Sequence, residues 1–117
     1  MEPFTVPDLN AQGYSFSQDW FTQHIPNWQA YVTPSLKDEP IACLEIGCFE
    51  GLSTVWQLQH LCTHAEARLH CVDPWPDPLV CKRFNQNILH SGFSKKVRRY
   101  RSTGLTRFCS PVAHATG

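Results

Sequence analysis

The 117-residue sequence lacks a long hydrophobic run, a net charge and the cysteine spacing of a zinc site. No apolar run approaches the ~20 residues of a membrane-spanning helix, and the prolines and acidic residues after Met1 argue against a signal peptide. Ten acidic and ten basic side chains cancel, so no global field attracts nucleic acid or an anionic membrane. The apolar share of 42% and the charged share of 17% are typical of one globular domain. We expect a soluble, cytoplasmic protein with no nucleic-acid and no membrane partner.

The six cysteines do not have the pattern of a metal site or of a disulfide framework. No two of them form a C-x-x-C pair, and the histidines do not combine with them at zinc-finger spacing. Cys43 and Cys71 lie inside apolar runs, where cysteine behaves as a small hydrophobic residue. We therefore expect reduced thiols and no bound metal. Five histidines are expected to be surface or packing residues: His60, His64, His70, His90 and His114.

Residues 1–40 are expected to form an N-terminal arm followed by short helices. Residues 1–14 contain two prolines and a glycine with little periodicity, which predicts a loose arm. Aromatic and aliphatic residues then recur at near-helical spacing; Ser17 could cap the first turn, and Pro26 should divide the segment into two helices. We expect this aromatic stripe to pack against a sheet and residues 33–40 to form a turn-rich linker.

Residues 41–102 alternate between short apolar runs, which predict strands, and segments of helical periodicity. The predicted order is strand 41–46, helix 52–62, strand 67–72, helix 79–90 and strand 96–100. The first strand has the composition of a parallel strand covered on both faces. This alternation predicts an α/β fold: a partial Rossmann-like, doubly wound parallel sheet of about three strands with flanking helices. Residues 103–117 show no coherent period and are expected to form an irregular tail.

The two predicted helices each carry an apolar stripe at the spacing of one helix face. In the first helix the stripe consists of Leu52, Val55, Trp56, Leu58 and Leu61. In the second helix we expect Val80, Phe84, Ile88 and Leu89 to face inward, with Gly92 as the C-terminal cap.

A glycine-bearing turn, from Gly47 to Gly51, follows the first predicted strand. Because glycine has no Cβ, such a turn lets the backbone approach a ligand, and the next helix directs its free N–H groups toward it. Asp73 closes the second strand, where a carboxylate can accept hydrogen bonds from both hydroxyls of a ribose. We interpret the two features together as a nucleoside site.

The turn departs from the G-x-G-x-x-G pattern of dinucleotide-binding proteins. Phe49 stands at the middle glycine position, where it would crowd a pyrophosphate, and Leu52 stands at the third. S-adenosylmethionine contains no pyrophosphate, but its amino group and carboxylate need partners. Glu45 could hold the ammonium, and Ser53 with the helix N-terminus could hold the carboxylate. A nicotinamide-dependent oxidoreductase is the less favoured alternative.

Residues 45–54, with the pattern E-I-G-C-F-E-G-L-S-T, resemble motif I of the class I S-adenosylmethionine-dependent methyltransferase superfamily. The resemblance is closest to the small-molecule branch, which includes catechol- and caffeoyl-type O-methyltransferases. The strand that ends at Asp73 and the helix after it also resemble the next elements of the family, and the similarity covers about residues 19–101. The resemblance implies a Rossmann-like fold with S-adenosylmethionine as cofactor.

The resemblance also implies roles for individual residues of this sequence. Glu45 and Gly47 would face the methionine part of the cofactor, Phe49 and Gly51 belong to the turn that lines the pocket, and Ser53 would meet the methionine carboxylate. The ribose would be bound by Asp73 and the adenine flanked by Trp75. Structural alternatives stay open: Glu45 as a cap of a backbone turn, Ser53 as a helix-start residue, and Trp75 as a packed loop aromatic.

The family has elements that this sequence does not show. Its fourth strand pairs with the first and ends in an acidic motif, which in many members binds metal or acts in catalysis, but no such strand follows Ser102. We therefore expect a truncated chain with the cofactor-binding half only, little activity of its own, and an unpaired edge on the first strand through which it self-associates. A non-catalytic interaction module is the alternative function. The catalytic residues and the methyl acceptor are not predicted.

Overall fold

The computed structural model describes residues 4–101, and its centre is a three-stranded parallel sheet in the order β1-β2-β3. The strands are β1 (Ala42–Ile46), β2 (Arg68–Asp73) and β3 (Val97–Arg101). Between them lie α4 (Leu52–His60), α5 (Pro78–Ser91) and the 3-10 helix η2 (Ser94–Lys96). The alternating order predicted from the sequence is confirmed, and the chain has a partial Rossmann-like α/β fold.

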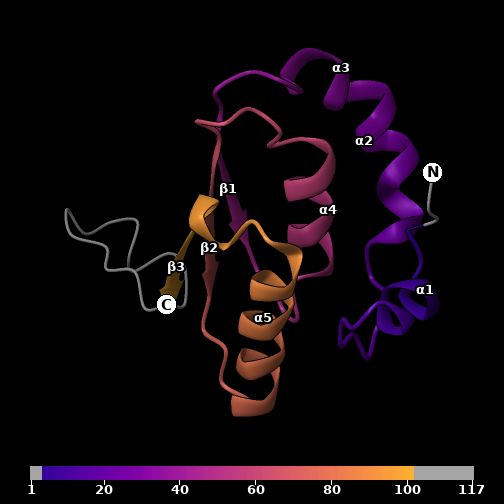
Figure 1. Cartoon of the computed structure of the whole chain (residues 1–117), viewed down its shortest axis with the longest axis vertical. Helices are drawn as coiled ribbons and strands as arrows, with labels where there is room; N and C mark the ends of the chain where they lie inside the picture. Colours follow the sequence, from indigo (N-terminus) through magenta and orange to yellow (C-terminus); the bar gives the residue numbers. More distant parts are fainter. Residues whose placement is uncertain (1–3, 102–117) are drawn as a thin grey trace.

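Both crossover helices lie on the same side of the sheet (Figure 1). Side chains alternate along β1, so Cys43 and Glu45 face α4, whereas Leu44 and Ile46 on the opposite face are 52% and 63% exposed. The prediction that this strand is covered on both faces is wrong for residues 4–101, because α4 and α5 pack on one face only.

The core forms between the sheet and the two crossover helices. All five residues of the apolar stripe predicted for this helix are buried: Leu52, Val55, Trp56 and Leu58 in α4, and Leu61, which caps its C-terminus. In α5, Phe84 and Ile88 are fully buried as predicted, and Gly92 is the left-handed C-terminal cap. The prediction for Leu89 is wrong, since this side chain is 70% exposed. The polar Asn87 takes the inward position at helical spacing from Phe84, because hydrogen bonds satisfy its amide.

The N-terminal segment contains more helix than the sequence predicted. Residues 1–14 were expected to be a loose arm, but α1 (Val6–Ala11) forms because the Thr5 hydroxyl accepts from Asp8 N–H at its start and Leu9 is buried. The predicted linker likewise contains a helical turn, α3 (Thr33–Leu36). No helix among residues 4–101 is both long and apolar enough to cross a membrane.

The predicted cap and packing of the aromatic segment are also wrong. Ser17 caps no helix; Asp19 instead accepts from the N–H of Phe21 and Thr22 at the start of η1 (Thr22–His24). Pro26 lies in the first turn of α2 (Ile25–Tyr31), where its missing N–H costs nothing. Phe21 and Trp28 pack against Trp56 of α4 rather than against the sheet, because α4 lies between this segment and the sheet (Figure 1). Trp20 contacts Phe49 of the turn, and Tyr31 is 81% exposed.

Candidate functional site

The turn between β1 and α4 occupies the left-handed region of backbone conformation at three positions: Gly47 (φ 81°), Phe49 (φ 50°) and Gly51 (φ 91°). A Cβ built on Gly47 would meet no atom within 4 Å, so this glycine faces open space. A Cβ on Gly51 would lie 3.0 Å from Phe84 Cδ2. Gly51 is therefore required by the backbone and by packing against α5, whereas Gly47 leaves room for a ligand.

Asp73 lies beside this turn, as the sequence predicted. Its Oδ2 accepts hydrogen bonds from Cys48 N (2.8 Å) and Phe49 N (3.1 Å), and its Oδ1 accepts one from Trp75 N (2.7 Å). Gly47 N also donates to Val72 O at 2.8 Å, which extends the pairing of β1 and β2 to the turn. A carboxylate has about four lone-pair directions, so three backbone bonds leave capacity for a hydroxyl.

Phe49 and Trp75 are linked, and both have positive φ, 50° and 40°. The indole Nε1 of Trp75 donates to Phe49 O at 3.0 Å. A bulky residue in this region costs about 1–3 kcal/mol, and such strain is concentrated at functional sites. No residue-type signal predicts it, because neither side chain favours positive φ. The Trp75 ring is 2% exposed and lies 4.8 Å from the Phe84 ring, so little of it is available to an adenine; that role stays a prediction.

The Glu45 carboxylate accepts hydrogen bonds from two hydroxyls of α4, those of Ser53 and Thr54. Burial raises the pKa of Glu45, the two hydroxyl bonds and the Cys48 thiol oppose this rise, and the negative charge of Asp73 adds to it. Within residues 4–101 no basic side chain forms an ion pair with Glu45. A half-buried carboxylate without a cation is suited to bind one. The sequence predicted Glu45 and Ser53 here but gave Thr54 no role.

Glu50 attaches the N-terminal segment to the turn, a role that the sequence analysis missed. The side chain is 1% exposed and accepts from Ser17 N (2.8 Å), Ser17 Oγ (2.8 Å) and Arg83 Nη1 (2.9 Å). Asn87 of α5 reinforces the attachment, because it accepts from Ser15 N and donates to Ser15 O and Glu50 O. An isolated glutamate in a turn usually faces solvent, so its sequence position carried no signal of burial.

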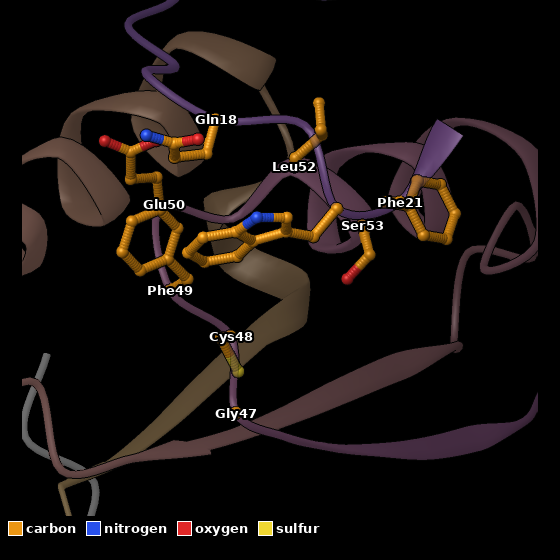
Figure 2. Close-up of a pocket in the computed structure, with 9 residues that line it drawn as sticks. Gln18, Phe21, Gly47, Cys48, Phe49, Glu50, Leu52 and Ser53 are labelled. Atoms are coloured by element: carbon orange, nitrogen blue, oxygen red, sulfur yellow. The ribbon is translucent and has the colours of Figure 1, made fainter. Parts of the chain in front are cut away.

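A cavity of about 140 Å³ lies between the turn and the attached N-terminal segment. Figure 2 shows the side chains that line it, with Phe49 and Ser53 apart from each other and Cys48 and Gly47 below them. The Trp20 ring is 4.6 Å from the Phe49 ring. The lining residues are Gln18, Trp20, Phe21, Gly47, Cys48, Phe49, Glu50, Leu52 and Ser53.

The predicted site residues therefore fall into three groups. Gly47, Phe49 and Ser53 line the cavity, and Glu45 contacts it through Ser53. Asp73 supports the turn from the neighbouring strand end.

The remaining two predicted residues, Gly51 and Trp75, lie away from the cavity lining and contact Phe84 in the core.

A cluster beside the cavity has the ligand types of a metal site. The nearest donor atoms of Glu45, Cys48 and Cys71 lie within 4.8 Å of one another. The pKa of Cys48 lies above its ordinary value because of its hydrogen bond with Cys71, burial and the nearby negative charge of Glu45. The Glu45 carboxylate already accepts hydrogen bonds from Ser53 and Thr54. We assign no metal to this cluster.

Comparison with family models matches residues 44–115 to the family described as a methyltransferase domain. The matched range includes β1, the glycine turn and Asp73. It also extends through residues 103–115, which lie outside the described residues and in which we expected departure from the family. Comparisons with curated proteins and with solved structures found no match.

Proposed function

The chain belongs to the methyltransferase domain family, and on this premise we propose that its glycine turn binds S-adenosylmethionine for methyl transfer. When bound, this cofactor supplies an electrophilic methyl group on a sulfonium sulfur. The cavity of about 140 Å³ is smaller than the roughly 300–1,000 Å³ that encloses a drug-sized ligand. We therefore assign it to the amino-acid end of the cofactor and place the nucleoside outside it, over the strand ends.

The unpaired carboxylate of Glu45 is the observation that carries this proposal. Its two oxygens already accept from Ser53 and Thr54, which fixes the carboxylate beside the cavity before a ligand arrives. An ammonium group would supply the missing positive charge and donate to the remaining lone pairs. The N–H groups in the first turn of α4 provide the complementary site for the ligand carboxylate.

Asp73 has a double role in this proposal. It holds the turn through Cys48 N and Phe49 N, and its remaining acceptor capacity would receive a ribose hydroxyl. We expect Trp75 to act indirectly, by holding the carbonyl of Phe49.

Calorimetric titration of the whole chain tests cofactor choice. We expect heat of binding for S-adenosylhomocysteine and none for NADH, because Phe49 leaves no room for a pyrophosphate. Glu45→Gln should weaken binding about ten- to hundredfold, the value of one charge-assisted hydrogen bond. Glu66→Gln, at an exposed position, is the matched control. Equal affinity of both variants would contradict the role of Glu45, and NADH binding would contradict the choice of cofactor.

We further infer that methyl transfer by this chain is slow. Among its described lining residues, the cavity offers no free base: Glu50 is bound to Arg83 and Ser17, and the raised pKa of Cys48 keeps its thiol protonated. The chain would then accelerate transfer chiefly by positioning the reactants. Incubation with labelled S-adenosylmethionine and a panel of phenolic and carboxylate acceptors tests this inference. Robust turnover would contradict it without affecting the proposal of cofactor binding.

The sheet supports a second candidate function, as an interaction module that binds a second copy. Within residues 4–101, β1 pairs only with β2, and Leu44 and Ile46 are exposed on the face without helices. Light scattering should show a mass that rises with chain concentration, and Ile46→Lys should suppress the rise. Leu89→Lys on α5, at another exposed aliphatic residue, should not suppress it. A constant monomer mass for the unmodified chain would exclude this candidate.

A further inference from the structure

Two cysteines of the described chain lie in sulfur contact at the far end of α4 from the glycine turn. Cys62 Sγ donates to Cys43 Sγ at 3.8 Å. We propose that these two thiols form a redox modification site, which peroxide oxidises to an intramolecular disulfide. The proposal rests on the geometry of the pair and is independent of cofactor binding.

The backbone at both cysteines is held in place. Cys43 lies within β1, paired with Leu69 of β2. Cys62 N donates to Gln57 O at 2.7 Å, and Cys62 O accepts from Lys96 Nζ at 2.7 Å. A disulfide has a sulfur–sulfur distance of ~2.05 Å, so the two sulfurs, now 3.8 Å apart, must approach by roughly 1.7 Å for the bond to form.

The two thiols differ in accessibility and acidity, which assigns their order of reaction. Cys43 is half-buried in β1, which is an edge strand among the strands of residues 4–101, whereas Cys62 has no exposed surface. The hydrogen bond from Cys62 lowers the pKa of Cys43 to about 7, against the opposing effect of burial. Reactive thiols are accessible ones with a depressed pKa. Cys43 is therefore the attacking thiol and Cys62 the resolving one.

The chemistry balances with hydrogen peroxide as the oxidant. The Cys43 thiolate attacks one peroxide oxygen, the O–O bond breaks, and the released hydroxide takes a proton to become water, leaving a sulfenic acid. The Cys62 sulfur then attacks the Cys43 sulfur, the S–S bond forms, and the hydroxyl leaves with the Cys62 proton as a second water. Two thiols are oxidised and one peroxide is reduced.

The depressed pKa of Cys43 gives an expected rate. A fall from 9.0 to about 7 raises the thiolate fraction at neutral pH about fiftyfold, while the lower basicity reduces nucleophilicity about eightfold. Cys43 should thus react about six times faster than an ordinary exposed thiol. The second close pair in the described chain, Cys48 and Cys71, should remain reduced, because these residues are 4% and 0% exposed.

Peroxide treatment of the whole folded chain, followed by thiol alkylation and mass mapping, tests the proposal. A protease that cleaves after glutamate separates Cys43, Cys48 and Cys62, because Glu45 and Glu50 lie between them. We expect one cross-linked Cys43–Cys62 species that thiol reductants reverse.

Variants identify the role of each thiol. Cys62→Ser should stop the reaction at a Cys43 sulfenic acid that dimedone traps, and Cys43→Ser should leave Cys62 reduced. Cys81→Ser, at another half-buried cysteine, should leave the cross-link unchanged.

Three results would overturn the proposal. One is that Cys43 and Cys62 are both alkylated after Cys81 has been oxidised. Another is oxidation of Cys48 with Cys71 before Cys43 reacts. The third is a cross-link that forms equally fast in urea, because the folded geometry would then contribute nothing.

Discussion

Glu50→Ala should destabilise the chain far more than an alanine substitution at an exposed glutamate. The side chain is 1% exposed, and its removal breaks three hydrogen bonds: two with Ser17 and one with Arg83. Ser17 itself is exposed, and loss of its two part-buried hydrogen bonds to Glu50 costs about 1–2 kcal/mol in total. Arg83 is 29% exposed and regains water, so its lost bond contributes about 1 kcal/mol. The emptied volume adds about 1 kcal/mol.

The sum is about 3 kcal/mol, near the lower end of the roughly 3–5 kcal/mol measured when one partner of a buried ion pair is removed. For a domain of this size it corresponds to a decrease in melting temperature of about 12–24 °C. Thermal unfolding followed by circular dichroism measures the change, with Glu66→Ala as the exposed control. A double-mutant cycle with Arg83→Ala isolates the ion pair.

A free energy of unfolding for Glu50→Ala within about 0.5 kcal/mol of that for Glu66→Ala, the range of ordinary surface substitutions, would contradict this structural role of Glu50. Additive effects of Glu50→Ala and Arg83→Ala on the free energy of unfolding would contradict it as well. Two residues that share a hydrogen bond should show a coupling energy.

Three further predictions concern the turn. The folded pKa of Glu45 is raised above its ordinary 4.5, so the contribution of this group to stability is present below pH 4.5 and is lost as the pH rises through the folded pKa. In chemical unfolding at several pH values, the stability of Glu45→Gln should therefore increase relative to that of the unmodified chain as the pH rises. Parallel stability profiles of the two proteins would contradict this. Gly51→Ala should lower the free energy of unfolding by about 2–4 kcal/mol, because backbone strain adds to the close contact with Phe84. Gly92→Ala, at a similar φ but in open space, should lower it by about 1 kcal/mol. Equal losses of stability in thermal unfolding would exclude an effect of the contact with Phe84. Asp73→Asn should weaken the binding of S-adenosylhomocysteine, measured by calorimetry, by about tenfold, because the amide offers one acceptor oxygen to the turn in place of two. An unchanged affinity would show that Asp73 supports neither the turn nor the ligand.

The sheet and its crossovers could be predicted because their signals are local. Apolar runs, helical periodicity and the positions of Gly47 and Gly92 each follow from neighbouring residues. The predicted proximity of the turn and Asp73 also follows from topology, since parallel strands that are adjacent end at the same edge.

The features that the sequence did not predict depend on contacts between distant segments of the chain. Ser17 was predicted as a helix cap because its type favours caps, but Glu50, 33 positions later, takes both of its donors. Leu89 was predicted as buried because it is apolar, yet Asn87 fills that side of α5 since two other segments satisfy its amide. The positive φ of Phe49 occurs together with a hydrogen bond from Trp75 to its carbonyl, which no residue pattern indicates.

The attachment of Ser17 to Glu50 has a practical consequence for expressing parts of this protein. The family match begins at residue 44. A fragment cut to that range would keep Glu50, the acceptor, and discard Ser17, the donor. Trp20 and Phe21, which line the cavity from outside the match, would be lost with it. A unit that keeps this cavity wall and its attachment thus includes Ser15, 29 residues before the boundary at residue 44 that sequence similarity sets.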